Sequence, residues 1–240
     1  MESLTDAGIA IVGQGRLGKA LTFAMKGAEL RVIGPLGRGA DGDGAGIVIL
    51  CVPDSAIADA ARAVPPGKLV GHCSGASTLA PLQPHEAFSM HPLMTVAGNV
   101  SVSFAGAGCA IAGTSERARR VAIELARRLR LKPFELKDAD RDLYHAAASL
   151  ASNYLMTLEG AAERLAGIVG VERELLLPLV RTAVENWGRL GARQALTGPI
   201  VRGDLATSNR QHAAVALRAP DLLPLWDALT MATQALAQTE

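Results

Sequence analysis

The chain has 240 residues, 49% of them hydrophobic and 20% charged, which is the composition of a globular protein with material for a substantial core. A formal net charge of +1 and an aromatic content of 3% argue against a nucleic-acid partner, which needs basic surface and stacking platforms. No stretch has membrane-spanning character, so no membrane partner is expected.

Seven β-like runs and three helical runs alternate from the start of the chain, as in βαβ units with a parallel sheet. The predicted strands are 8–13, 29–34, 46–53, 68–75, 87–94, 108–113 and 132–137. The predicted helices are 16–27, 55–64 and 115–130. The strand at 46–53, GIVILCVP, is nearly all apolar, so we expect it to be buried on both faces. The first half therefore predicts an α/β fold with a Rossmann-like, mostly parallel sheet.

The connection between the second and third predicted strands is unusual. Residues 35–45, PLGRGADGDGA, hold four glycines where a doubly wound fold would place a crossover helix. We expect a loop there.

After Asp138 the strand pattern ends and four helical stretches follow, at about 140–168, 172–193, 204–218 and 220–238. We therefore expect two domains. Residues 1–137 form a dinucleotide-binding domain, and residues 138–240 form an all-helical domain for substrate binding and dimerisation.

The stretch GIAIVGQGRLGKAL carries a G-x-G-x-x-G motif between a predicted strand and a predicted helix. In such a turn Gly13 permits the tight bend, Gly15 lets a pyrophosphate approach the backbone, and Gly18 allows close helix–strand packing. The helix N-terminus offers unpaired N–H groups to the phosphates. The predicted cofactor contacts along this turn are Gly13, Gln14, Gly15, Arg16, Leu17 and Gly18. A glycine-rich turn without a ligand is the alternative.

The residues after the second strand bear on the choice of cofactor. An NAD site places a carboxylate there for the ribose 2′-hydroxyl, but this chain has Ile33, Gly34 and Pro35, followed by Arg38. A guanidinium binds a 2′-phosphate well. The sequence therefore favours NADP(H) over NAD, with a solvated loop arginine as the alternative.

Further candidate residues follow the carboxyl ends of later strands, where open α/β sheets bind ligands. Val52 and Pro53 are expected beside the nicotinamide, and Ser74 beside nicotinamide or substrate. His91 ends the next strand and is expected to line the substrate site or to bond to backbone. His72 and Cys73 are adjacent in a strand, so their side chains point to opposite faces and form no nucleophilic pair; no metal site is predicted.

The helix after residue 140 has no charged residue between Asp142 and Glu159, so we expect most of its circumference to be buried. His145, Ser149 and Asn153 are spaced four residues apart and would form one polar stripe along it. Buried polar groups need partners. The stripe therefore contacts either a substrate or the neighbouring helices.

The segment LTGPIVRGDLATSNRQH, residues 196–212, places Arg202 in a glycine-flanked loop suited to binding a carboxylate in bidentate fashion. Asp204 occupies an N-cap position. Thr197, Thr207 and His212 add hydrogen-bonding groups to a substrate or to an interhelical network.

Five stretches in order, GIVILCVPDSAI, GHCSGASTLAPL, SMHPLMTV, DRDLYHAAASLASNYL and ALTGPIVRGDLATSNRQH, resemble a family with a Rossmann-like domain followed by a DUF2520 helical domain. This family is similar to pyrroline-5-carboxylate reductase, ketopantoate reductase, and the 6-phosphogluconate and β-hydroxyacid dehydrogenases. The resemblance implies a 6-phosphogluconate dehydrogenase-like helical domain, an NADP-linked reductase and a homodimer formed through the helices. Loop 35–45 is shorter than in the family.

The resemblance also implies catalytic roles. Related dehydrogenases carry Lys and Asn four residues apart on the interdomain helix, and this chain has no lysine there. His145 then takes the place of the proton donor, with Ser149 and Asn153 orienting the carbonyl oxygen. The predicted activity is NADPH-dependent reduction of a small 2-oxo acid such as ketopantoate. An imine reductase, a non-catalytic NADP sensor or scaffold, and a deazaflavin in place of NADPH stay open.

The three cysteines, Cys51, Cys73 and Cys109, show no CxxC spacing, and no basic-then-apolar leader opens the sequence. These features predict reduced thiols in a cytoplasmic protein.

Overall fold

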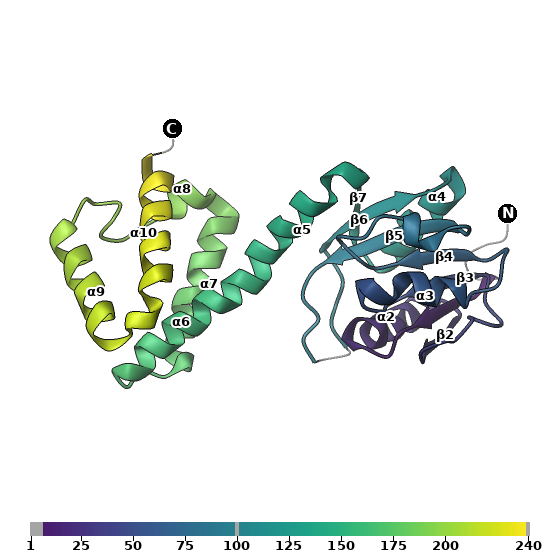
Figure 1. Cartoon of the computed structure of the whole chain (residues 1–240), viewed down its shortest axis with the longest axis horizontal. Coiled ribbons are helices and arrows are strands. Elements are labelled where there is room, and N and C mark those ends of the chain that lie inside the picture. The colour runs from purple at the N-terminus through teal and green to yellow at the C-terminus, as the bar shows by residue number, and fades with distance from the viewer. Residues whose placement is uncertain (1–6, 99–100, 239–240) are drawn as a thin grey trace. The chain divides into compact units, whose positions relative to one another are not determined.

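The computed structural model describes residues 7–98 and 101–238 (Figure 1). It divides into two compact units, the first ending at Ser152 and the second beginning at Asn153. The last strand ends at Glu135, and only helices and loops follow it in the described chain. The outermost bounds of the two expected domains, residues 1 and 240, lie outside the described residues.

Within the described residues, all seven predicted strands are present and form one sheet in the order β2-β1-β3-β4-β5-β6-β7. Neighbours from β2 to β5 are parallel, β6 runs antiparallel to β5, and β7 runs parallel to β6. This confirms the mostly parallel, Rossmann-like sheet. The strands are β1 (Ile9–Val12), β2 (Val32–Leu36), β3 (Ile47–Leu50), β4 (Leu69–His72), β5 (Glu86–Leu93), β6 (Gly108–Gly113) and β7 (Lys132–Glu135).

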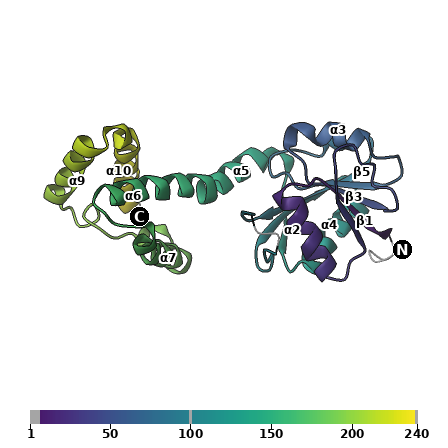
Figure 2. The same cartoon turned by 90° about the horizontal axis from the view of Figure 1, so that it is seen from below.

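Helices cover both faces of the sheet. Successive strand residues point to opposite faces, and both faces carry apolar side chains that must be buried. Ile9 and Ile11 pack on the face that carries α2 (Arg16–Gly27) and α4 (Glu116–Arg128). Ala10 and Val12 pack on the other face, which carries α3 (Ile57–Arg62) (Figure 2). Every residue of β3 is consequently buried, as its apolar run predicts.

The connection from β2 to β3 is a loop, as its glycine content predicts. It packs directly on the sheet where other crossovers use a helix. A side chain at Gly42, whose φ is +69°, would bring its Cβ to 2.5 Å from the Val48 side chain. The ammonium group of Lys68 donates to the carbonyl of Gly42. The loop backbone at Gly42 therefore packs directly against β3, and the hydrogen bond from Lys68 holds it there.

The four predicted helical stretches of the second half are confirmed. The first is interrupted by a π-helical turn at Leu150–Tyr154, and the second ends in a separate short helix. The α-helices are α5 (Arg141–Ser149), α6 (Leu155–Ile168), α7 (Arg173–Leu190), α8 (Ala192–Ala195), α9 (Leu205–Arg218) and α10 (Leu223–Gln238).

The expectation that the helix from 142 to 159 is mostly buried is wrong for the single chain. Leu143 is 77% exposed and Leu150 63% exposed. The lack of charge along this helix reflects apolar surface. In the described part of the second unit, only Val215 and Ala219 are buried apolar residues. No described helix is both long enough and apolar enough to cross a bilayer.

Two glycines of α2 give a matched test of how closely this helix packs on the sheet. A Cβ on Gly18 would lie 1.9 Å from the backbone oxygen of Gly13, whereas one on Gly27 would meet no atom within 4 Å. We expect Gly18→Ala to lower the free energy of unfolding by about 3 kcal/mol, because the clash is with backbone.

Gly27→Ala should raise the free energy of unfolding by up to about 1 kcal/mol, because alanine favours the helix. Urea denaturation of both variants measures this contrast. Equal stability of the two would contradict close packing at Gly18.

Candidate functional site

The glycine turn between β1 and α2 divides its three motif glycines into two kinds. Gly13 has a φ of +125°, and its Cβ position lies 2.2 Å from the carbonyl oxygen of Cys51. Gly18 is equally closed by the Gly13 backbone. Gly15 has an ordinary φ of −69° and open space around its Cβ position. Gly13 and Gly18 are therefore required by packing, and Gly15 leaves room for a ligand to approach the backbone.

The N-terminus of α2 is free to bind an anion. Gly15 is the N-cap residue and supplies no side chain to the first-turn N–H groups, and the first turn holds no acidic residue. Unpaired N–H groups with the positive end of the helix dipole form an anion site. Arg16 is exposed in the same turn and adds a guanidinium.

The end of β2 carries no carboxylate. Ile33, Gly34 and Pro35 lie within the strand, and Arg38 is exposed in the turn that follows it. The Gln14 amide nitrogen lies 4.0 Å from the Cβ position of Gly37. The glycine turn and the turn after β2 are therefore close to each other in space. Asp41, the next carboxylate, accepts a hydrogen bond from the Asp43 backbone N–H.

A cavity of about 510 Å³ lies at the carboxyl ends of β1, β3, β4 and β5, within the first unit. Its size is in the usual range for small-molecule sites. Eight residues predicted from sequence line it: Gly15, Arg16, Leu17, Val52, Pro53, Ser74, His91 and His145. The predicted residues that do not line it are Gly13, Gln14, Gly18, Arg38, Ser149, Asn153, Thr197 and Arg202.

Asp54 is a cavity residue that the sequence analysis missed. The hydroxyl of Ser74 donates to Asp54 Oδ2 at 2.7 Å and accepts from the backbone N–H groups of Ala76 and Ser77. One serine therefore organises the loop after β4 and places a carboxylate in the cavity. The signal was present, because Asp54 directly follows Pro53 beyond the end of β3.

His91 lies beside two aromatic side chains of α5. Its Nδ1 is 2.7 Å from the Tyr144 hydroxyl, and its ring centre is 6.5 Å from that of His145. Burial, and then the nearby His145, lower the pKa of His91 to about 4. His91 is therefore neutral at physiological pH. Tyr144 gave no signal in the sequence, because only the tertiary structure brings it to the end of β5.

Arg141 holds α5 against the sheet and was also missed. Its side chain is only 2% exposed. Nε donates to Asp138 Oδ1 at 2.7 Å, and Nη2 donates to the Ser89 hydroxyl at 2.9 Å. Because Tyr144 and His145 follow one turn later on α5, this contact positions both of them.

His72 and the two cysteines that line the cavity, Cys51 and Cys73, make contacts within the protein. His72 is buried, with Nε2 at 3.0 Å from the Thr78 carbonyl and Nδ1 accepting from the Ser74 N–H. The Sγ atoms of Cys51 and Cys73 are 3.8 Å apart. This contact and burial raise the pKa of the Cys51 thiol, so it stays protonated and is a poor nucleophile.

Ser149 lies one helical turn after His145 on α5, as the four-residue spacing predicts. Ser149 ends α5, and Asn153 lies in the π-helical turn that follows. Neither Ser149 nor Asn153 lines the cavity.

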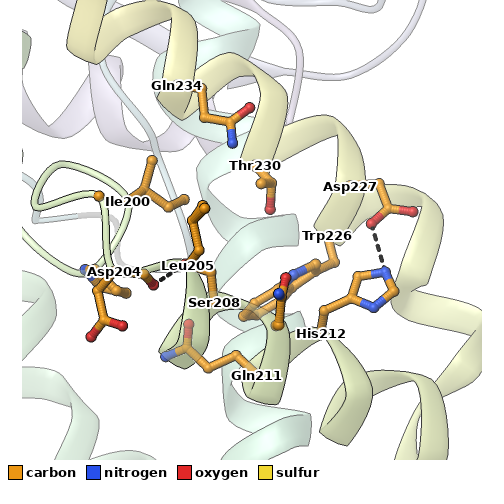
Figure 3. A pocket seen from close by; sticks show the side chains of 13 residues that line it. Ile200, Asp204, Leu205, Ser208, Gln211, His212, Trp226, Asp227, Thr230 and Gln234 are labelled. Carbon is orange, nitrogen blue, oxygen red and sulfur yellow. Dashed lines mark hydrogen bonds and ion pairs between the residues drawn. The ribbon is translucent and has the colours of Figure 1, made fainter.

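The second unit has a polar groove of about 160 Å³ between α9, α10 and the loop before α9 (Figure 3). Asp204 caps α9, as predicted, by accepting from the Thr207 N–H at 3.0 Å. His212 Nε2 lies 3.2 Å from Asp227 of α10. Thr197 and Arg202 are exposed and do not line this groove.

The buried state of His91 predicts a pH-dependent stability. Its pKa is about 4 in the fold and near 6.5 in the unfolded chain, so the unfolded chain binds an extra proton between these values. Stability therefore falls as the pH is lowered through this window. His145, Arg141 and His72 lower this pKa, and Asp54 opposes them.

We expect His91→Gln to reduce the fall in Tm between pH 7 and pH 4.5 by roughly 3 °C. Thermal unfolding followed by circular dichroism measures this change in Tm. His85→Gln is the control, because His85 directly precedes β5 and lies beside the Ala61 carbonyl. An unchanged pH dependence in His91→Gln would show that His91 protonates freely in the fold.

Several solved structures share the fold along nearly the whole chain. A proposed NADP oxidoreductase from Bacteroides fragilis has a TM-score of 0.84 and 20% identity, covering 97% of this chain and 100% of the other. A protein from Thermotoga maritima has a TM-score of 0.77 and 21% identity, covering 96% and 98%. Pyrroline carboxylate reductase from Plasmodium falciparum, solved with NADP bound, has a TM-score of 0.64 and 12% identity, covering 98% and 100%.

No curated protein matches the chain. A family model does: the domain of unknown function DUF2520 matches residues 107–233, more than half of the 240 residues. This span includes β6, α4, β7 and all of the helices that follow up to α10. Because the match covers more than half of the chain, the chain belongs to the DUF2520 family.

Proposed function

We propose that the protein is an NADPH-dependent oxidoreductase that reduces the C=O group of a small 2-oxo acid, of the ketopantoate kind. The observation that carries this proposal is the open backbone at Gly15, at the uncapped start of α2 and on the wall of the cavity. A pyrophosphate fits this position, and the rest of a dinucleotide can then extend along the carboxyl ends of the strands.

The residues present suit NADPH in particular. The turn after β2 offers the Arg38 guanidinium and no carboxylate, which favours a 2′-phosphate. Gln14, close to this turn, is a further contact. Two solved relatives in fold, the Plasmodium falciparum reductase and a reductive aminase from Aspergillus terreus, hold NADP and NADPH respectively. When bound, the reduced nicotinamide supplies a hydride to the substrate carbon.

The chain's own residues would position the reactants and supply a proton. Val52 and Pro53 line the cavity and would lie beside the nicotinamide, and Ser74 would contact the nicotinamide or the substrate. A developing alkoxide needs a proton donor, and the imidazoles of His91 and His145 are the candidates in the cavity. This pair takes the place of the lysine found in related dehydrogenases.

Four residues outside the cavity keep the roles that the family resemblance and their chemistry suggest. Ser149 and Asn153 orient the carbonyl oxygen. Arg202 and Thr197 are exposed in the loop before α9 and bind the substrate carboxylate, for which a guanidinium is well suited. The substrate in this proposal is accordingly a small carboxylate, and the reducing cytoplasm suits three free thiols.

A specific observation favours a second substrate class, a cyclic imine acid. Asp54 places a carboxylate in the cavity, while His91 is neutral at physiological pH. A carboxylate stabilises a cationic iminium, which arrives with its proton already in place. A panel of 2-oxo acids and cyclic imines, followed by loss of NADPH absorbance, separates the two classes. NADPH binding without turnover on any of them would favour a sensor or scaffold.

Gly15 allows the cofactor proposal to be tested without a known substrate. We expect Gly15→Ala to fold normally, since its Cβ meets no protein atom within 4 Å, and to weaken NADPH binding at least tenfold by filling the space of the pyrophosphate. Fluorescence titration with NADPH measures the Kd, with Gly27→Ala as the control. Arg38→Ala should weaken NADPH and leave NADH unchanged. Unaltered NADPH affinity in Gly15→Ala would refute this cofactor site.

We also propose that the helical unit pairs with a second copy of the chain. Only three of the large apolar side chains exposed in the described residues precede Leu143, namely Phe23, Leu93 and Phe134. The others lie in the chain from α5 onward, and the described part of the second unit buries only Val215 and Ala219 among its apolar residues. Such a unit lacks a core of its own, and a matching apolar face on an identical chain would complete it.

Sedimentation should therefore give about twice the chain mass of 24.9 kDa. Leu175 and Leu179 lie one turn apart on α7, each 70% exposed. Changing both to Glu should produce a monomer, because charges would be buried in the pair. Phe23→Glu, on α2, is the control and should stay dimeric. A wild-type monomer at micromolar concentration would reject the homodimer.

A further inference from the structure

Tyr144 contacts His91 from the side away from the cavity. Its hydroxyl is 2.7 Å from His91 Nδ1, and the two rings meet edge to face with centres 5.6 Å apart. Phe134 of β7 packs against the same tyrosine, with ring centres 5.9 Å apart. His91 lines the cavity and Tyr144 does not. Any influence of Tyr144 on a bound substrate must therefore pass through the imidazole.

The other edge of the His91 ring faces the cavity wall at Gly75. A Cβ on Gly75 would lie 2.9 Å from His91 Cε1, 3.0 Å from Nε2 and 3.1 Å from His145 Cδ2. Both imidazoles thus reach the space that the missing side chain of Gly75 leaves open. One ring nitrogen of His91 is engaged by tyrosine, and the other lies where a ligand would meet it.

Two features define the protonation of this pair. Burial keeps His91 neutral, with a pKa of about 4, so its ring carries one N–H. Burial also raises the pKa of Tyr144 to about 12, so its hydroxyl keeps its proton. When that hydroxyl donates to Nδ1, the single ring proton resides on Nε2, at the cavity edge. A neutral imidazole held in this tautomer is a directed hydrogen-bond donor.

We propose that Tyr144 and His91 form a proton relay in which His91 Nε2–H is the donor to the substrate and Tyr144 is the positioning residue that sets its tautomer. The relay rests on the proposed reductase function. As the substrate carbon accepts a hydride and its two electrons, the C=O oxygen takes the proton from Nε2 and becomes a hydroxyl. Nδ1 takes the proton of Tyr144 in the same step. After the product leaves, the tyrosinate takes this proton back from Nδ1 as Nε2 takes a proton from solvent, which restores the starting tautomer.

The geometry distinguishes this relay from direct donation by His145. His145 is exposed, and no tyrosine hydroxyl is hydrogen-bonded to it in the described structure. His91 has the Tyr144 hydroxyl on Nδ1, and its Nε2 faces the cavity. The imidazole can therefore give a proton from Nε2 while it takes one from tyrosine at Nδ1. In this scheme His145 contributes by disfavouring a charged His91.

The first test needs no substrate. Two-bond ¹H–¹⁵N NMR of the 240-residue chain reports the tautomer of each of its five histidines. We expect His91 to carry its proton on Nε2 in the wild type, and to show a mixture of tautomers in Tyr144→Phe, which keeps the ring packing and removes the hydroxyl. Tyr154→Phe, at the chain's other tyrosine, is the matched control and should leave His91 unchanged. An Nδ1–H tautomer in the wild type would overturn the relay.

The second test uses whichever oxo acid is reduced. Tyr144→Phe should lower kcat about tenfold and His91→Asn about a hundredfold, each with little change in KM. The double variant should be no slower than His91→Asn, because both residues act on one proton. An unchanged kcat in Tyr144→Phe, or additive losses in the double variant, would overturn the relay while the reductase itself stood.

Failure of the proposed function has a different signature. If the wild type neither bound NADPH in a fluorescence titration nor reduced any oxo acid or imine, the reductase proposal would fall, and the relay with it. Intact turnover with an insensitive Tyr144→Phe variant rejects only the relay. The two failures are therefore separable.

Discussion

The buried guanidinium of Arg141 is the contact on which the geometry of the candidate site depends. It donates to Ser89 of β5 and to Asp138 just before its own helix. Ser89 and His91 lie two residues apart and therefore face the same side of β5, while Arg141 and Tyr144 lie one turn apart on α5. The arginine–serine contact and the tyrosine–histidine contact are thus successive links between the same helix and the same strand.

A charge buried to this extent is costly unless its hydrogen bonds are made. Arg141 meets this condition with one exposed carboxylate and one buried hydroxyl. The energetic penalty of moving the guanidinium keeps the helix in place, since any slide of α5 along β5 would leave a buried charge unpaired. Rigid placement of this kind is what a site needs if hydrogen-bond distances at His91 are to hold.

The glycine turn shows how one motif serves two purposes. Gly13 and Gly18 allow α2, β1 and β3 to approach until backbone meets backbone, and any side chain there collides with protein. Gly15 has no such neighbour. The same three-glycine spacing therefore encodes a packing requirement at its ends and an open surface at its centre, and only the open surface argues for a ligand.

Much of this architecture could be predicted from the sequence. The seven strands, the loop in place of a helix after β2 and the helical second half follow from periodicity and from glycine, which act over short stretches of chain. Seven of the eight predicted cavity residues follow strand ends, which meet at one edge of a parallel sheet. The eighth, His145, was predicted from the polar stripe on its helix. Asp54 stood at such an end and was predictable on the same ground.

The contacts of Arg141, Tyr144 and His91 were decided by the tertiary structure alone. They join residues about fifty positions apart, and nothing in the local pattern of either segment specifies its partner. The apolar helix after Asp142 shows the same limit in another form. Its sequence determined that it must avoid water, but whether it does so inside one chain or against another depends on which surfaces the folded chain leaves uncovered.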